Sequence, residues 1–215
     1  MECEQLELLG LNCRSRTECL RLMLALAARK FNDRRLTIAQ WRQMKKEELS
    51  ENFPEEALLP VLRKHENNEV IVGALEIGRY LATQLGFYGD SDEERLEIDA
   101  IIADLESMQS ALAPVIRATL AKDFDRRKLC WAVFMETTLN ERLARLTERL
   151  GQRLFFVGSK ISWADIAVAD QLSTFSSCFD GLFLNRYLTL KAHKMRIESL
   201  PNIRKYIAER PQTPF

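Results

Sequence analysis

Hydrophobic and polar residues recur along the first part of the chain with the spacings of both strands and helices. Apolar positions three and four residues apart predict helices over residues 14–29, 38–51 and 74–85. Short apolar runs predict strands at residues 6–10, 30–36, 58–63 and 70–72. The polar stretch 65–68 separates the last two strands and predicts a hairpin turn. We therefore expect an α+β domain with the order strand, helix, strand, helix, strand, strand, helix.

The second part of the chain has helical spacing throughout. Leu, Ala, Arg and Glu dominate residues 92–122 and 125–150, and Pro114 should kink the first of these helices because proline lacks a backbone N–H donor. Ser162 and Asp165 form a capping box before a helix that is apolar on nearly all sides. This helix should therefore lie at the centre of its domain.

A segment rich in glycine separates the two parts. Residues 85–91 contain Gly86 and Gly89 and are the expected linker. We assign residues 1–84 to the first domain and residues 92–215 to the second. The order of elements in the first domain resembles that of thioredoxin-like domains. The expected fold class is therefore α+β, with a thioredoxin-like N-terminal domain and an all-helical C-terminal domain.

Composition and charge exclude several classes of function. Lys+Arg and Asp+Glu balance at 31 each among the 215 residues, so neither nucleic acid nor an anionic membrane is the expected partner. No apolar run approaches the roughly 20 residues that a membrane-spanning helix needs. The chain has two histidines and no Cys-x-x-Cys motif, so we expect no metal site and no bound cofactor.

The cysteines and the N-terminal residues indicate a cytoplasmic protein. The five cysteines are odd in number and widely spaced, which is typical of reduced thiols and not of a disulfide framework. They are Cys3, Cys13, Cys19, Cys130 and Cys178. The acidic start of the chain lacks the basic and apolar regions of a secretory signal.

Four short motifs carry a resemblance to a known family. They are Arg14-Ser15-Arg16-Thr17-Glu18, Leu59-Pro60, Ser162-Trp163-Ala164-Asp165 and Arg210-Pro211-Gln212-Thr213-Pro214-Phe215. Together they resemble the glutathione S-transferase family, in particular its sigma-like class, which includes nematode enzymes and haematopoietic-type prostaglandin D synthases. The resemblance implies a homodimer and makes glutathione a possible co-substrate.

Several positions match the glutathione site of that family. Arg16 corresponds to an arginine near the glutathione thiol, and Trp41 and Lys45 correspond to the pair that holds the glycine end. Leu59 and Pro60 correspond to a cis-proline edge whose backbone pairs with the tripeptide. Each position also has a simpler interpretation: a solvated arginine, a core tryptophan, an exposed lysine, and a proline that the fold itself requires.

Other positions depart from the family pattern. The tyrosine that activates glutathione is replaced by Gly10, and the Gln-Ser pair that receives the γ-glutamyl carboxylate is replaced by Gly73-Ala74. The aspartate that the partner subunit contributes falls at Ser107, with Glu106 beside it as a possible replacement. Each lost charge-assisted contact costs about 1.5–3 kcal/mol, so the resemblance implies a weak or vestigial glutathione site.

No catalytic residue is assigned, but two residues near Gly10 are candidates for a substitute. Ser15 and Cys13 lie close to where other transferase classes place a catalytic serine or cysteine, and Arg14 and Arg16 would lower the pKa of a Cys13 thiol. The alternative is a loop serine and a half-buried cysteine. We also expect a Gly10→Tyr exchange to restore the missing hydroxyl.

The resemblance further implies an apolar ligand cleft, and three functions remain open. The cleft would be lined by Leu11, Met108, Leu112 and Phe215, which would also suit a core. The leading hypothesis is a homodimer with a degraded glutathione site, weak or no conjugating activity, and a role in binding small apolar ligands or in structure, as in the lens crystallins of this superfamily. The alternative is an active glutathione S-transferase that ionises glutathione through Ser15 or Arg16 and a backbone dipole. A third is a module that docks partner proteins.

Overall fold

The computed structural model describes residues 5–47, 58–67 and 69–213. These residues form two compact units. The first contains the described residues up to Phe87 together with Leu200–Thr213, and the second is Tyr88–Ser199. No helix in these described ranges is long and apolar enough to cross a membrane.

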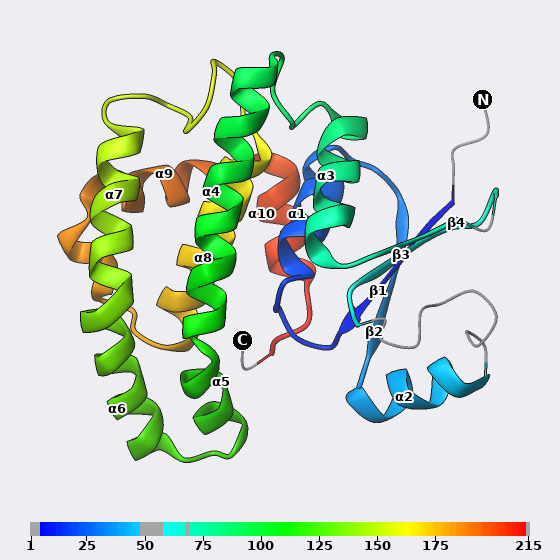
Figure 1. The fold of residues 1–215 in the computed structure, drawn as a ribbon, viewed down its shortest axis with the longest axis horizontal. Coiled ribbons are helices and arrows are strands. Elements are labelled where there is room, and N and C mark those ends of the chain that lie inside the picture. Colours follow the sequence, from blue (N-terminus) through cyan, green and yellow to red (C-terminus); the bar gives the residue numbers. More distant parts are fainter. Residues whose placement is uncertain (1–4, 48–57, 68, 214–215) are drawn as a thin grey trace. The chain divides into compact units, whose positions relative to one another are not determined.

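The first unit combines a four-stranded sheet with four helices (Figure 1). Its elements are β1 (Leu6–Leu11), α1 (Glu18–Leu26), β2 (Phe31–Leu36), α2 (Ile38–Glu47), β3 (Val61–Lys64), β4 (Glu69–Val72), α3 (Ala74–Leu85) and α10 (Pro201–Glu209). The strand order is β2-β1-β3-β4; β1 runs parallel to β2, and the other two pairs are antiparallel. This sheet confirms the predicted thioredoxin-like arrangement.

Side chains of β1 alternate between the two faces of the sheet, and each face is covered by different helices. Leu9 belongs to a buried cluster with Trp41 and Met44 of α2. Its neighbour Gly10 instead faces Thr17 and Arg21, at the start of α1. In Figure 1, α2 lies on one side of the strands, and α1 and α3 lie on the other.

The first helix is shorter than its hydrophobic spacing predicts. We expected a helix from residue 14, but β1 continues to Leu11 and α1 begins only at Glu18. Ser15 has a φ of 41°, in the left-handed region, so the residues around it cannot continue a right-handed helix. The intervening residues therefore form a loop between β1 and α1, hereafter the β1–α1 loop (residues 12–17).

The second unit is helical, as the sequence predicts. Its elements are α4 (Asp92–Ala111), α5 (Ala113–Leu120), α6 (Phe124–Phe134), the π-helical turn η1 (Met135–Leu139), α7 (Asn140–Leu150), α8 (Trp163–Cys178), the 3-10 turn η2 (Phe183–Arg186) and α9 (Leu188–Ser199). Pro114 lies in the first turn of α5, where a missing N–H donor is tolerated. The predicted kink lies at Leu112, where α4 ends and α5 begins. The helix expected over residues 125–150 is present as α6, η1 and α7 in direct succession, with η1 as a π-helical turn inside it.

The capping box at the start of α8 is confirmed, and α8 is buried along most of its length. Asp165 Oδ2 accepts hydrogen bonds from Ser162 N at 2.8 Å and from Ser162 Oγ at 2.6 Å. Asp165 Oδ1 accepts from Phe156 N at 2.9 Å and lies 2.9 Å from His193 Nε2. This carboxylate therefore joins three separate segments of the helical unit.

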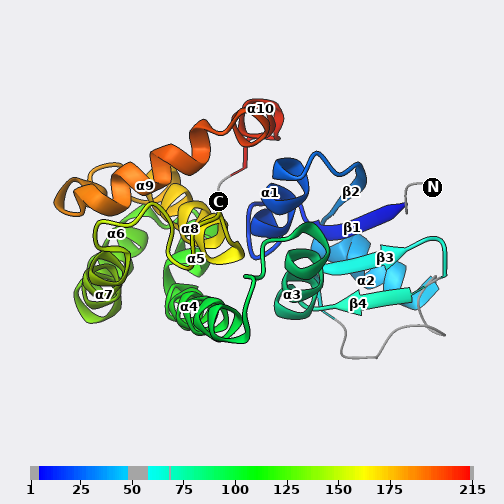
Figure 2. The same cartoon turned by 90° about the horizontal axis from the view of Figure 1, so that it is seen from above.

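The C-terminal helix α10 packs with the first unit, although the sequence-based division places it in the helical domain. Figures 1 and 2 both show α10 beside α1. Asn202 Nδ2 of α10 donates to the Leu26 carbonyl oxygen at the end of α1, at 3.1 Å. Side-chain hydrogen bonds of this kind cannot be inferred from hydrophobic spacing.

Candidate functional site

The space beside Gly10, which by resemblance corresponds to a catalytic tyrosine, is already filled. A Cβ atom at residue 10 would lie 2.6 Å from Thr17 Cγ2 and 2.8 Å from both Thr17 Oγ1 and Arg21 Nη2. Thr17 is 1 % exposed, and every staggered χ1 rotamer leaves a heavy atom in one of these two positions. A Gly10→Tyr exchange therefore requires Thr17 or the backbone to shift, and we expect that it does not restore the hydroxyl by itself.

Cys13 is enclosed in the β1–α1 loop and is poorly suited to act as a thiolate. The residue is buried, and burial raises the pKa of its thiol. A hydrogen bond with Ser15 and the charge of Arg21 act in the opposite direction but are weaker. The expected lowering of the Cys13 pKa is therefore wrong: the enclosing loop outweighs the nearby positive charge.

Ser15 makes local hydrogen bonds within the same loop. Its Oγ lies 3.4 Å from Thr17 Oγ1 and accepts a long hydrogen bond from Thr17 N at 3.5 Å. Activation of a serine needs an adjacent base, and the contacts of Ser15 are with Thr17 and the Cys13 thiol, neither of which is one. The hydroxyl of Ser15 thus helps to shape the turn that leads into α1.

A closed ring of hydrogen-bonded side chains, of which Glu18 and Arg21 are buried and the others half-buried, lies beside Gly10. Going round it, Glu18 Oε2 accepts from Arg21 Nη1 at 3.1 Å, and Arg21 Nε donates to Asp33 Oδ1 at 2.9 Å. Arg35 Nε donates to Asp33 Oδ2 at 2.8 Å, and Arg35 Nη2 donates to the Tyr206 hydroxyl at 3.0 Å. Tyr206 closes the ring by donating to Glu18 Oε1 at 3.2 Å. We call these five residues the ion ring.

The ion ring holds the β1–α1 loop through Arg21. The guanidinium donates from Nη1 to the Cys13 carbonyl oxygen at 3.1 Å and from Nη2 to the Leu11 carbonyl oxygen at 3.4 Å. Glu18 and Arg21 have no exposed side-chain surface, and Arg210 Nη1 donates to Glu18 Oε1 at 2.8 Å. Buried charges are stable only when they are paired and hydrogen-bonded, and this arrangement meets that condition.

The ring also perturbs the titration of its members. Burial raises the pKa of Tyr206 well above the ordinary tyrosine value, and the Glu18 carboxylate raises it further. For Arg21, burial opposes the charged form, yet Asp33 and Glu18 hold its pKa above the usual value. Tyr206 therefore stays a neutral hydroxyl that accepts from Arg35 and donates to Glu18.

The proline edge and the start of α3 lie together in the first unit. The Leu59-Pro60 peptide bond is cis, and the Pro60 carbonyl oxygen accepts from Gly73 N at 3.0 Å. Gly73 has a φ of 96° and caps α3 without a side chain, and Ala74 is the first residue of that helix. The backbone amides of the α3 N-terminus are thus present, but neither Gly73 nor Ala74 adds a side-chain hydroxyl.

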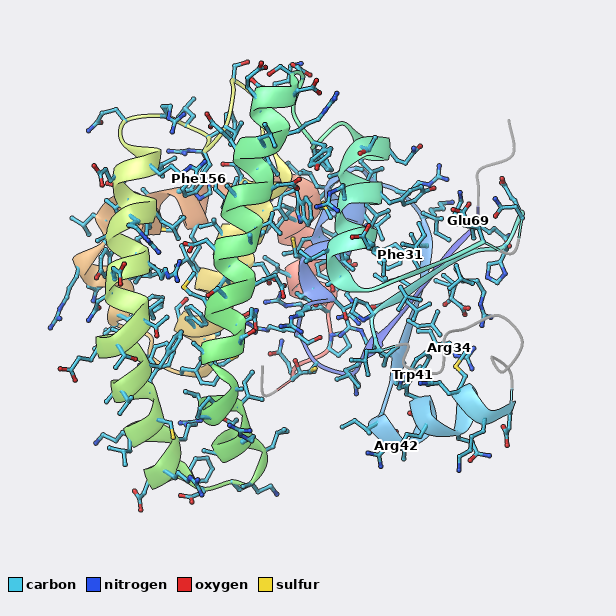
Figure 3. All side chains as sticks on the ribbon, in the orientation of Figure 1. Phe31, Arg34, Trp41, Arg42, Glu69 and Phe156 are labelled. Atoms are coloured by element: carbon cyan, nitrogen blue, oxygen red, sulfur yellow. The ribbon has the colours of Figure 1, made fainter. Side chains whose placement is uncertain are left out.

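The other predicted glutathione-site residues of the first unit lie on the face of the sheet that α2 covers or in the β1–α1 loop. Trp41, labelled in Figure 3, is buried in the cluster of α2 and the sheet. Leu59 packs on the same cluster. Lys45 is half-buried in the last turn of α2, and Arg16 is exposed just before α1. Trp41 therefore has the core environment of its simpler interpretation, which leaves its indole little surface for a ligand.

The predicted residues of the helical unit lie along α4 and just beyond it. Met108 and Leu112 are 1 % and 2 % exposed, so both are core residues of this unit. Glu106 is half-buried and Ser107 is exposed on α4. The other two residues predicted to line the apolar cleft lie elsewhere. Leu11 is half-buried at the end of β1 in the first unit, and Phe215 lies outside the described residues.

Several residues of this region were missed by the sequence analysis. Thr17, Glu18 and Arg21 lie in or next to the Arg14–Glu18 motif, but only their buried positions indicate that they fill and brace the space beside Gly10. Tyr206 and Arg210 are far away in the sequence, and no spacing rule connects them with α1. Within the described ranges, no group of three or more His, Cys, Asp or Glu residues could hold a metal ion.

Comparison with known proteins identifies the family. The family model described as "Glutathione S-transferase, C-terminal domain" matches residues 111–210. The chain is 30 % identical over 214 residues to glutathione S-transferase 1 of Ascaris suum, covering 98 % of this chain and 99 % of that relative. It is 29 % identical over 202 residues to hematopoietic prostaglandin D synthase of Gallus gallus, covering 94 % of each chain. The crystal structure of the glutathione S-transferase from Ascaris lumbricoides matches with a TM-score of 0.84 and 28 % identity over 98 % of this chain and 100 % of that one. This chain belongs to the glutathione S-transferase family.

Proposed function

We propose that this protein is a sigma-like glutathione transferase homologue with a degraded glutathione site. It has little or no conjugating activity and serves as a ligand-binding or structural protein. The observation that carries this proposal is the filled space beside Gly10, where Thr17 and Arg21 leave no room even for a Cβ atom. A thiol is a weak nucleophile until a neighbouring group lowers its pKa, and residue 10 supplies no such group.

The two candidate replacements support the same conclusion. The thiol of Cys13 is buried and its pKa is raised by that burial, so it is not poised to form a mixed disulfide. The hydroxyl of Ser15 is engaged with Thr17. Neither residue has the surroundings of an activated nucleophile.

The start of α3 supports weakened binding of the γ-glutamyl carboxylate. The helix N-terminus attracts an anion through its backbone amides, but Gly73 and Ala74 add no hydroxyl or amide side chain. A lost hydrogen bond to a charged group costs about 1.5–3 kcal/mol, which corresponds to roughly a tenfold to hundredfold loss of affinity. Retained positions such as Trp41 and Lys45 would offset only part of that loss.

We further propose that the protein is a cytoplasmic homodimer. In the family pattern, Ser107 with Glu106 beside it would face the glutathione amino group of the partner subunit, and both residues have accessible surface on α4. Analytical ultracentrifugation at micromolar concentration tests the assembly. Sedimentation at twice the chain mass of 24.9 kDa supports the dimer, and sedimentation at the chain mass overturns it.

Turnover of a generic aromatic electrophile, such as a chlorodinitrobenzene, with reduced glutathione tests the proposed function. We expect no rate above the uncatalysed background for the wild-type protein. A saturable, enzyme-dependent rate would overturn the proposal and favour an active transferase that works without the phenol.

A pair of variants shows whether only the catalytic group has been lost. Gly10→Tyr alone should be inactive and poorly folded because Thr17 occupies the space that the new side chain needs. The double variant Gly10→Tyr/Thr17→Ala removes both Thr17 atoms from that space and leaves Arg21 Nη2 as the remaining close atom among the three nearest to a Cβ at residue 10. Activity in the double variant would mean that glutathione still binds, whereas continued inactivity of a folded double variant would mean that the binding site has been lost as well.

A further inference from the structure

One face of α10 bonds to both ends of α1. Asn202, Tyr206 and Arg210 are spaced four residues apart, so they lie on the same side of the helix and just beyond it. Asn202 binds the Leu26 carbonyl oxygen at the C-terminal end of α1, and Tyr206 and Arg210 bind Glu18 in its first turn. The C-terminal helix therefore spans α1 and fixes the turn from which the β1–α1 loop departs.

The contact continues from Glu18 to the loop itself. Tyr206 and Arg210 share Glu18 Oε1, at 3.2 Å and 2.8 Å, and the other carboxylate oxygen accepts from Arg21. Arg21 then donates to the carbonyl oxygens of Leu11 and Cys13. Three consecutive interactions thus connect the C-terminal helix with the backbone around Cys13.

The charges in this chain of contacts depend on one another. Arg21, Arg35 and Arg210 face the carboxylates of Glu18 and Asp33, so removal of one partner leaves another buried charge uncompensated. Arg21 is fully buried and cannot exchange its protein partners for water in place. If Glu18 loses both partners on α10, its Oε1 atom loses two donors and the carboxylate is held by Arg21 alone, so the guanidinium that donates to the loop carbonyls is less firmly positioned.

We propose that the C-terminal helix α10 is a positioning element for the β1–α1 loop: Tyr206 and Arg210, acting through Glu18 and Arg21, hold the loop closed around Cys13. The loop carries the residues nearest to Gly10, so α10 sets the conformation of the region where this family performs its chemistry. The inference concerns only contacts within the first unit. It holds whether or not the protein binds glutathione, and its test is independent of any transferase activity.

The alkylation rate of each cysteine by a maleimide, read by peptide mass spectrometry, tests this inference. Arg210→Ala, Tyr206→Phe and the double variant are compared with the wild-type chain. We expect Cys13 to react about tenfold faster or more in the double variant, because two hydrogen bonds to a buried charge are lost. Cys130 and Cys178 lie in the helical unit and should keep their wild-type rates. Hydrogen exchange of the β1–α1 loop amides should rise in parallel.

Two control variants separate positioning from general destabilisation. Lys205→Ala changes an exposed residue of α10 and should leave Cys13 protected. Arg210→Lys keeps a positive charge near Glu18 and should recover part of the protection. An unchanged Cys13 rate in the double variant overturns the inference. An equal acceleration at Cys13, Cys130 and Cys178 also overturns it, because that result means that the ring only stabilises the fold.

Discussion

Substitution of Gly10 by alanine adds one methyl group in a place that the structure shows to be occupied. The new Cβ would lie 2.6 Å from Thr17 Cγ2 and 2.8 Å from Thr17 Oγ1, both shorter than the 3.0 Å that real Cβ atoms keep. Overpacking of a filled interior costs about 1–3 kcal/mol. Because Thr17 cannot rotate out of the way, we expect Gly10→Ala to lower the free energy of unfolding by an amount in the upper part of this range.

A second substitution, at Thr17, relieves the clash and predicts the direction in which the two effects depart from additivity. Thr17→Ala removes both close atoms; alone it should cost about 1–2 kcal/mol for the lost methyl contacts and the hydroxyl. Combined with Gly10→Ala, the new methyl occupies the vacated space. We therefore expect the double variant to be more stable than the sum of the single effects predicts, by about 1 kcal/mol or more, with residual strain against Arg21 Nη2.

Equilibrium urea unfolding of the four proteins, with midpoints compared at a common m value, measures these effects. Gly181→Ala is a matched control, since its new Cβ would meet Ser176 O at an ordinary 3.7 Å. This control should change stability by less than about 0.5 kcal/mol. The reasoning fails if Gly10→Ala is as well tolerated as Gly181→Ala, or if the effects at residues 10 and 17 are additive.

Three further predictions follow from buried polar groups. Asp165→Ala should lower the free energy of unfolding by about 3 kcal/mol or more in urea titrations, whereas Asp123→Ala at the exposed cap of α6 should cost about 1 kcal/mol. The folded-state pKa of Tyr206 lies above its unfolded value, so its contribution to stability is fully present below a pH of about 10 and is lost as the pH rises from there through the folded-state pKa. Stability measured against Tyr206→Phe should therefore fall in strongly alkaline solution, and a constant difference would contradict this. Alkylation of Cys13 should reach its half-maximal rate at a pH above the ordinary cysteine pKa, because burial raises the pKa of this thiol; a midpoint at or below that value would contradict the enclosed loop.

The elements of the fold could be predicted because each depends on neighbours in the sequence. The spacing around Ser162 and Asp165 predicted the α8 capping box, and Pro114 predicted a kink where α4 ends and α5 begins. Strand and helix order followed from short apolar runs and polar turns. The predicted start of α1 was wrong because the hydrophobic pattern does not show that Ser15 adopts a left-handed conformation.

The surroundings of Gly10 could not be predicted, since they depend on contacts between distant parts of the chain. The sequence shows that residue 10 lacks a side chain, but not that Thr17 and Arg21 fill the remaining space. The contact between Glu18 and Arg210 joins residues 192 positions apart, and nothing in their spacing indicates it. The direction of the Cys13 pKa likewise depends on burial, which outweighs the nearby arginines that the sequence displays.

Isothermal titration calorimetry of the wild-type protein with reduced glutathione tests most directly whether the glutathione site is degraded. Because Thr17 and Arg21 fill the space beside Gly10, and because Gly73 and Ala74 offer no side-chain donor, we expect no saturable heat up to millimolar glutathione. Saturable binding with a dissociation constant in the micromolar range would contradict this. It would mean that the Pro60 edge, Trp41 and Lys45 still form a working glutathione site.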